Sequence, residues 1–425
     1  MKIGIIGSGF TGLSAGLQLS KKGHEIVIFE SSDRIGGLAT GFERNNWNWS
    51  LESHYHHIFK SDYSILNLAK EVDHKILFLK PRTSLLYKSK MFQIDNPISL
   101  LKFPYLDLVS KFRTGLTLVY LKLLINWKSL EKINVSDFLK KTMGRSSWSI
   151  LWEPLFIQKF GKFMTVIPAS WFWARIKKRS AALGYPEGGF LKLAKTVAFE
   201  IEKRSGKILL KSNVKEIKKE NDNIVVSLSN GKEYVFDKLI CTSNSSSFVK
   251  MTKGLPKKYA YKISNMKSLG VITLILCLRD RYFNDKTYWL NINDLEYPFT
   301  AIVEHTNFID KGNYGGCNIL YVSKYLEVGN EYYSKNENQL LDKFTPFLKK
   351  INPSFSKNWV REKFLFKSSF AQPIVSLNYS KEIPKIITPI EGIFLANMQQ
   401  VYPWDRGTNY AVELGEKVAK IILSK

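Results

Sequence analysis

Cysteine is scarce in this chain. Only three of the 425 residues are cysteine, at Cys241, Cys277 and Cys317, and no two of them form a Cys-x-x-Cys pair. This spacing supports neither a disulfide framework nor a zinc site, so a reducing cytoplasm is the default expectation. A secretory leader is not expected either, because the first apolar run passes straight into a glycine-rich turn.

Acidic residues are also few. The chain has 63 basic residues against 37 acidic ones, a formal net charge of +26. This balance suits an anionic membrane face, a phosphorylated substrate or nucleic acid, whereas the plainest alternative is compositional drift, since the chain is also rich in Asn and Ile. The lysines are scattered and no nucleic-acid motif is present, so we expect no nucleic-acid partner. Drift combined with some affinity for a membrane surface is the favoured explanation.

No apolar run is long enough to span a bilayer. The pattern from Leu77 to Arg179 predicts long amphipathic helices, and the most apolar stretch, Leu116–Ile125, is short and interrupted by Lys122. It could lie on a membrane surface with its basic side chains snorkelling to the headgroups. Lining the wall of a substrate domain is at least as well supported.

The histidines do not have the pattern of a metal site. Three of the six lie within four positions, at His54, His56 and His57. Strand alternation would send His56 and His57 to opposite faces, and no other pair of ligands with suitable spacing is nearby. We therefore predict no metal.

The first forty residues have the layout of a dinucleotide-binding unit. An apolar strand at Lys2–Ile6 enters the turn Gly7-Ser8-Gly9-Phe10-Thr11-Gly12, a helical pattern follows, and a second strand ends on Glu30. Gly7 permits a tight turn, Gly9 lets the backbone approach a pyrophosphate, and Gly12 lets the helix pack on the strand. The start of the helix, with Phe10 and Thr11, offers N–H groups to phosphates, and Glu30 is placed to accept hydrogen bonds from a ribose. A glycine turn that binds nothing is the alternative, and it leaves Glu30 unexplained.

The segment after Glu30 resembles the motif that follows the first βαβ unit in glutathione-reductase-like FAD enzymes. It reads Ser31-Ser32-Asp33-Arg34-Ile35-Gly36-Gly37-Leu38. Adjacent glycines after a basic residue let the backbone pass close to a charged ligand. The resemblance implies FAD, with Ser31, Arg34, Gly36, Gly37 and Leu38 among its contacts.

The segment His57-Ile58-Phe59 is similar to the corresponding segment of UDP-galactopyranose mutase and of protoporphyrinogen-oxidase-like proteins. That similarity places His57, together with His56, near the flavin ring. Core or loop histidines are the competing interpretation.

Two later blocks resemble the flavin-containing amine oxidase superfamily. The turn Tyr185–Phe190 opens a helix, and Val214 then stands where the superfamily's strand contacts adenine. Near the C-terminus a strand ends at Ala396-Asn397, where the superfamily has Gly-Asp, so an amide replaces the carboxylate that would bind the ribityl chain. The next helix begins at Gly407-Thr408-Asn409 and is expected to point its positive end at the flavin. Asp405 and Arg406 are expected to face the pocket, with a surface ion pair as the alternative.

The resemblance implies an α/β fold with a Rossmann-like, glutathione-reductase-type FAD-binding domain and an inserted α+β substrate domain. The FAD-binding domain is expected from residues 1–75, 185–250 and 385–425, and the substrate domain from 76–184 and 251–384. No second Gly-x-Gly-x-x-Gly occurs, so a bound nicotinamide is not expected.

The implied activity is an FAD-dependent oxidoreductase that takes a hydride from an apolar or amphipathic small molecule onto flavin N5. The substrate class includes lipid-like and phosphorylated compounds, and the flavin is expected to be non-covalent. The alternatives are a redox-neutral isomerase similar to UDP-galactopyranose mutase and a flavin-binding protein that has lost catalysis. The expected location is the cytoplasm, with peripheral contact at the inner membrane face, and no catalytic base is identified.

Overall fold

The computed structural model describes residues 1–424. One half of the molecule is built on a five-stranded sheet in which every pair is parallel, in the order β10-β2-β1-β14-β20. The strands are β1 (Lys2–Ile6), β2 (Glu25–Phe29), β10 (Lys207–Leu209), β14 (Lys238–Cys241) and β20 (Ile393–Leu395). They are almost continuously apolar and buried, as strands covered on both faces must be.

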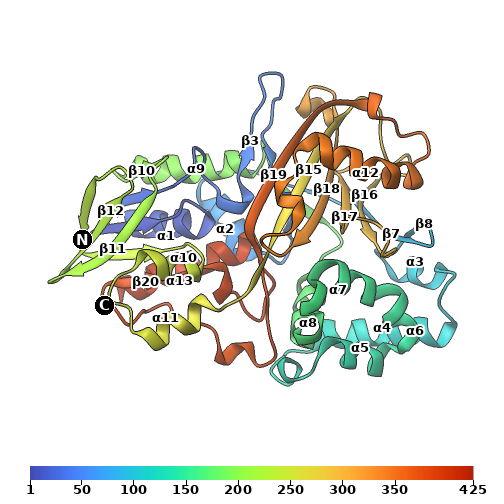
Figure 1. The fold of residues 1–425 in the computed structure, drawn as a ribbon, viewed down its shortest axis with the longest axis horizontal. Coiled ribbons are helices and arrows are strands. Elements are labelled where there is room, and N and C mark those ends of the chain that lie inside the picture. The colour runs from blue at the N-terminus through green and yellow to red at the C-terminus, as the bar shows by residue number, and fades with distance from the viewer. Residues whose placement is uncertain (425) are drawn as a thin grey trace.

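Helices cover this sheet. The helix α1 (Phe10–Ser20) lies between α9 (Phe190–Glu202) and α13 (Thr408–Leu423), packing against both. Figure 1 shows these helices side by side, at the end of the molecule that also holds both termini. A separate antiparallel sheet of β11 (Val214–Glu220), β12 (Asn223–Leu228) and β13 (Glu233–Phe236) flanks them. Asn230-Gly231 lies in the turn between β12 and β13, and Gly231 has a positive φ of 84°.

The other half contains a seven-stranded sheet in the order β19-β15-β18-β17-β16-β7-β8. Its strands are β7 (Arg82–Tyr87), β8 (Lys90–Gln93), β15 (Ser268–Leu278), β16 (Thr287–Ile292), β17 (Ala301–Glu304), β18 (Asn318–Leu326) and β19 (Val360–Pro373). All pairs are antiparallel except β7 with β16. The helix α12 (Glu337–Ile351) packs on β15 and β19 (Figure 1).

A helical lobe lies beside this sheet, at the lower right of Figure 1. It consists of α3 (Pro97–Lys102), α4 (Leu108–Leu123), α5 (Val135–Met143), α6 (Arg145–Ser147), α7 (Glu153–Phe160) and α8 (Ala169–Lys178). No helix among residues 1–424 is long and apolar enough to cross a membrane.

The prediction of helices from Leu77 onward is wrong for residues 77–93. These residues form β6 (Ile76–Leu79), β7 and β8. Here β6 pairs with β9 (Leu183–Pro186), and β7 pairs with β16, about two hundred residues further along. A short apolar run does not reveal such distant partners, because it suits a buried helix as well as a strand.

A disulfide joins Cys277 to Cys317, which the wide cysteine spacing did not predict. The pairing arises because Cys277, in β15, stands opposite Ile319 in β18, two residues after Cys317. Two cysteines that are forty residues apart in the sequence are thus neighbours in the sheet. The wide cysteine spacing therefore does not support a reducing compartment.

The strands divide along the lines of the predicted domains. The parallel sheet draws its strands from residues 2–29, 207–209, 238–241 and 393–395, and the seven-stranded sheet draws its strands from 82–93 and 268–373. The small sheet β5-β9-β6, with β5 at Ile58–Phe59, takes strands from both predicted domains. The exact domain division stays a prediction.

Candidate functional site

The glycine turn between β1 and α1 is tightly constrained at two of its three glycines. Gly7 has a φ of 101°, and a Cβ there would stand 2.3 Å from Thr242 Oγ1. At Gly12 a Cβ would stand 2.0 Å from the Gly7 carbonyl oxygen. Both glycines are therefore required by the protein's own packing.

Gly9 is different, because the protein itself leaves room for a side chain there. The nearest atom to a Cβ at Gly9 is Gly37 Cα, at 3.7 Å, which is ordinary van der Waals contact. Gly9 is also the N-cap of α1, with an ordinary φ of −67°, and so offers no capping side chain to the first turn. The bare backbone is thus open at the place where a pyrophosphate needs close approach.

The second glycine pair lies directly against this turn. Gly36 forms a bridge with Gly9 and donates its N–H to the Ser8 carbonyl at 2.9 Å. A Cβ at the exposed Gly37 would stand 3.0 Å from Gly9 Cα. The two glycine motifs, far apart in the predicted pattern, therefore form one cradle.

Glu30 faces the same turn from the end of β2. Its Oε2 accepts hydrogen bonds from the Ser8 N–H at 3.0 Å and from Ser8 Oγ at 2.8 Å. Its Oε1 accepts from the Ser32 N–H at 3.0 Å and from Ser31 Oγ at a longer 3.4 Å. The carboxylate is oriented by the backbone, and the weak Ser31 contact is the one that a ribose hydroxyl could replace.

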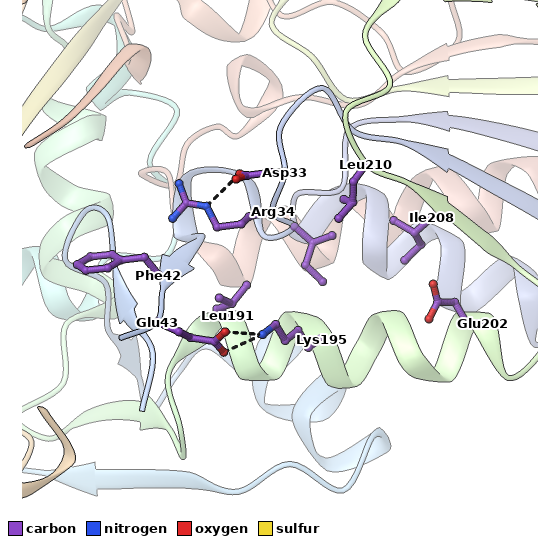
Figure 2. A pocket seen from close by; sticks show the side chains of 10 residues that line it. Asp33, Arg34, Phe42, Glu43, Leu191, Lys195, Glu202, Ile208 and Leu210 are labelled. Carbon is purple, nitrogen blue, oxygen red and sulfur yellow. Dashed lines mark hydrogen bonds and ion pairs between the residues drawn. The ribbon is translucent and has the colours of Figure 1, made fainter. Parts of the chain in front are cut away.

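Arg34 is held by the loop that follows. Its Nη1 donates to the Gly41 carbonyl at 3.1 Å, and its Nε donates to Asp33. A cavity of about 580 Å³ lies between this segment and α9, as Figure 2 shows. Apart from Arg34, none of the predicted cofactor contacts lines it: its other lining residues are Asp33, Ile35, Phe42, Glu43, Leu191, Lys195, Glu202, Ile208 and Leu210.

Three other predicted contacts are largely inside the protein. Phe10 is buried and packs edge-on against Phe190, so only its backbone remains for a ligand. Thr11 is buried in the first turn of α1, and Val214 is buried at the start of β11, opposite Leu228. Leu38, in the glycine loop, is partly exposed.

The start of α13 is a second helix end without a capping side chain. Its N-cap is Gly407, and Thr408 and Asn409 are buried in its first turn. Asn409 Oδ1 accepts from the Ile65 N–H at 3.2 Å, which anchors the helix start. By contrast, the start of α9 is occupied, because the buried Glu52 accepts from the Phe190 N–H at 2.8 Å. Of these helix ends, those of α1 and α13 are the ones left for a ligand.

Asn397 makes its hydrogen bonds within the protein. Its Nδ2 donates to the Ser243 carbonyl at 2.9 Å and to Ser245 Oγ, and its Oδ1 accepts from the Gln399 N–H. The ribityl contact predicted for Asn397 has no support from these bonds and stays a prediction.

The histidine segment lies between the two halves of the molecule. His54 Nδ1 is 2.8 Å from Thr273 Oγ1 in β15. The imidazole ring of His56 packs on the ring of Phe190 at the start of α9. The side chains of His54, His56 and His57 are partly exposed. We call the region between the two halves, beside these histidines, the cleft. His57 Nδ1 is buried without a hydrogen-bond partner among the described residues. An orphaned polar atom of this kind marks a place for a ligand or water.

These histidines are neutral at physiological pH. Burial, together with nearby cationic groups, lowers the pKa of His54 to about 3, of His56 to about 4 and of His57 to about 3. The contributing cations are Arg406 for His54 and His56, and Arg179 and Arg175 for His57.

Asp405 and Arg406 are partly buried and do not form a surface ion pair. Asp405 accepts hydrogen bonds from Arg175 and from Trp171 Nε1, and its carboxylate lies 3.8 Å from Lys159 Nζ. Arg406 donates to Gln372 Oε1 at 3.0 Å and to the Tyr325 hydroxyl. Burial alone would raise the pKa of Asp405, but Lys159, Arg175 and Arg406 hold it below its ordinary value.

The sequence did not single out Lys159, Arg175 or Arg179 as site residues. They belong to a helical region to which the sequence assigned no site role, and the packing of α7 and α8 brings Lys159 and Arg175 to Asp405. Because the chain has 63 basic residues, the sequence around any one of them does not predict which ones are buried.

The parallel sheet and the double-glycine cradle define a dinucleotide-binding fold. The chain belongs to the family described as flavin containing amine oxidoreductase, whose model matches residues 10–423. Membership implies a flavin cofactor and flavin-dependent oxidoreductase chemistry.

Individual relatives share little sequence with this chain. The 4,4'-diapophytoene desaturase of Staphylococcus haemolyticus is 35% identical over 51 residues, which are 12% of this chain and 10% of that protein. The match therefore spans about a tenth of that relative's length.

Solved structures share the fold. A reduced UDP-galactopyranose mutase is 15% identical with a TM-score of 0.77, covering 100% of this chain and 95% of that one. A putative protoporphyrinogen oxidase from Exiguobacterium sp. 255-15 is 14% identical with a TM-score of 0.75, covering 100% and 99%.

Proposed function

We propose that this protein binds FAD non-covalently and oxidises an organic small molecule in the cleft beside His54–His57. The observation that carries the proposal is the Gly9 cradle, where the backbone lacks a side chain although the protein has room for one. Glu30 at the end of β2 is the group that would hold the adenosine ribose, which favours a dinucleotide over a mononucleotide. Nothing in the sequence resembles a site of covalent flavin attachment.

Different groups of the predicted contact residues would hold different parts of the cofactor. The N–H groups at the start of α1, with Gly36 and Gly37, would hold the pyrophosphate, and Val214 would contact the adenine. The start of α13 would direct its positive end at the pyrimidine side of the ring, as Gly407, Thr408 and Asn409 are the residues there. His56 and His57 would lie beside the ring.

FAD supplies the hydride acceptor, at N5, when it is bound. The chain's own residues orient the substrate and exclude water. The neutral imidazoles of His54, His56 and His57 can donate or accept a hydrogen bond but bring no charge to the reacting atoms. Lys159, Arg175 and Arg406 fix the Asp405 loop against the cleft.

The redox-neutral isomerase remains the second candidate. The observation that favours it is the basic cleft, which suits the diphosphate of a nucleotide-sugar. The two candidates differ in what happens to electrons over a full turnover, and that difference can be measured directly.

The test is anaerobic. The holoenzyme is mixed with representative lipids, tetrapyrroles and nucleotide-sugars, and flavin absorbance is followed. The proposal predicts that one class bleaches the oxidised flavin stoichiometrically, and that an added acceptor restores the colour. Turnover that requires prior flavin reduction and consumes no acceptor would instead establish the isomerase.

A further inference from the structure

We propose that the cleft binds an anionic group of the substrate, a phosphate or a carboxylate, through Arg175, Arg179, Lys159 and Arg406. This inference rests on the proposed function, since it names the substrate class of the same site. The four cations come from separate elements: Lys159 from α7, Arg175 and Arg179 from α8 and its C-cap, and Arg406 from the loop before α13.

The cluster has more positive than negative charge. Among residues 1–424, the one carboxylate in direct contact with it is Asp405, which is ionised and paired with Arg175 and Lys159. Arg406 donates to the neutral partners Gln372 and Tyr325, so its charge stays uncompensated by hydrogen bonding to an acid. The Arg179 side chain makes no hydrogen bond or ion pair with residues 1–424, although Asp95 acts on it at longer range.

Uncompensated charge of this kind is costly in a cleft. Arg175 and Arg179 are exposed, so this cost falls on Lys159, whose side chain is largely buried. Burial, Arg175 and Arg406 lower the pKa of Lys159, although Asp405 opposes the shift. An arriving anion would relieve this repulsion and would meet guanidinium groups, whose planar donors match phosphate and carboxylate oxygens.

The arginines of the cluster lie close enough to the histidine segment to act on it. Arg179 and Arg175 act electrostatically on His57, and Arg406 acts on His54 and His56. An anion held by these groups therefore places the rest of the substrate beside the histidine segment. A protonated amine would be repelled by these cations. We therefore expect the substrate not to be an amine, although the family is described as amine oxidoreductases.

Aromatic rings give the cleft an apolar wall. Lys159 Nζ lies 4.7 Å from the centre of the Trp171 ring, and Tyr55 packs edge-on to Trp289 at 4.7 Å. A substrate with an anionic end and an apolar or planar body fits both parts of this lining.

The experiment measures anion binding by calorimetry on the purified protein, using inorganic pyrophosphate, benzoate and, as a cation, benzylamine. Arg179→Gln is the variant, and Arg145→Gln, at an exposed position in the helical lobe, is the control that removes the same charge. We expect pyrophosphate or benzoate to bind the wild type and the control, and Arg179→Gln to weaken that binding about tenfold or more. Tighter pyrophosphate binding identifies a phosphate substrate, and tighter benzoate binding a carboxylate.

Equal anion binding by Arg179→Gln and Arg145→Gln, or preferential binding of benzylamine, would overturn the inference. Flavin content is read separately from the absorbance of the same samples. A yellow protein that binds no anion contradicts this inference alone, whereas a flavin-free protein that binds anions contradicts the proposed function alone.

A second inference comes from α4, whose polarity is inverted. Its buried side carries the hydroxyls of Ser110, Thr114 and Thr117 beside the apolar Leu121, and Thr114 Oγ1 donates to Ser147 Oγ at 2.8 Å. Its outer side carries large apolar residues that are between 49% and 77% exposed: Leu108, Val109, Phe112, Leu116, Val119, Tyr120 and Leu123. We call these residues the α4 face.

The α4 face continues onto its neighbours. Ile98 and Leu101 of α3 are 64% and 59% exposed, and Ile125 after α4 is 85% exposed. A contiguous apolar surface of this kind marks an interaction site. Residues 97–132 also contain six basic residues and two acidic ones, so the partner should be negatively charged as well as apolar.

We infer that the α4 face docks on a lipid bilayer with anionic headgroups. Lys111, Arg113 and Lys122 lie on the same helix and donate to backbone carbonyls, which fixes charged groups at the border of the apolar surface. Lys122 donates to the carbonyl of Arg179, so the docking surface adjoins the cationic cleft.

The test is co-sedimentation with vesicles of phosphatidylcholine, with and without phosphatidylglycerol. We expect binding to the anionic vesicles, and loss of at least about tenfold in Phe112→Asp. Phe199→Asp, at a 62% exposed position on α9, is the matched control and should bind normally. Failure of the wild type to sediment, equal binding by both variants, or a dimer that Phe112→Asp dissociates without any vesicle binding would overturn the inference.

Discussion

At Gly9 the protein's own packing allows a side chain, whereas close approach of a pyrophosphate requires glycine. A methyl group there meets nothing closer than 3.7 Å within the protein, and the backbone φ of −67° suits any residue. Gly9→Ala should therefore leave the thermal unfolding of the flavin-free protein unchanged while lowering flavin affinity about tenfold or more, because the methyl group stands where the pyrophosphate must approach.

The matched control is Gly115→Ala, which adds the same methyl group in open space on α4. Flavin content after purification and titration of the flavin-free protein measure the effect. Normal flavin affinity in Gly9→Ala would contradict the assignment of the turn.

Glu52 makes stability depend on pH. Burial raises its pKa from 4.5 to about 7, although hydrogen bonds from Tyr185 and Phe190 oppose the shift. The folded state therefore favours the protonated form, so this contribution is complete below pH 4.5 and is lost as the pH rises toward 7. The loss at pH 8 amounts to about 3 kcal/mol.

Glu52→Gln keeps the shape of the side chain and cannot ionise: its Oε1 can accept from the Phe190 N–H, and its Nε2 would donate to the Tyr185 hydroxyl. We expect the wild type to lose stability relative to this variant between pH 4.5 and pH 8, as measured by urea unfolding at each pH. A constant difference across that range would show that the carboxyl does not change its protonation state there.

At the scale of elements, Asp405 joins α7, α8 and the loop before α13. Replacing it by Asn leaves Lys159, Arg175 and Arg406 without their carboxylate. Asp405→Asn should destabilise the protein by about 3 kcal/mol, and pyrophosphate should raise its melting temperature more than that of the wild type. Asp342→Asn, which breaks the exposed pair with Lys357, should cost less than about 1 kcal/mol. Similar losses in the two variants would contradict a buried role for Asp405.

Elements with a strong local pattern were predictable. The strands β1 and β2 and the helix α1 were predicted because their signals lie within a few residues of each other. The strands β6 to β8 were missed because their partners are remote. The inverted polarity of α4 is likewise invisible in sequence, since either face of an apolar helix could be the buried one.

At the scale of the whole molecule, the candidate site is assembled from both halves. The double-glycine cradle could be predicted residue by residue because spacing along the chain fixes it. The cationic cluster could not, because Lys159, Arg175 and Arg406 are brought together around Asp405 only by the docking of the helical lobe against the C-terminal loop. The net charge of +26 suggested an anionic partner without saying where it binds.

The central claim is that FAD lies along the first βαβ unit, held by backbone groups without a covalent bond. The most direct measurement is the visible spectrum of the purified protein before and after denaturation, with mass analysis of the released material. The account predicts a flavin spectrum in the folded protein and intact FAD in the supernatant after the polypeptide is precipitated. A protein that stays colourless after incubation with FAD, or colour that remains with the precipitated chain, would contradict it.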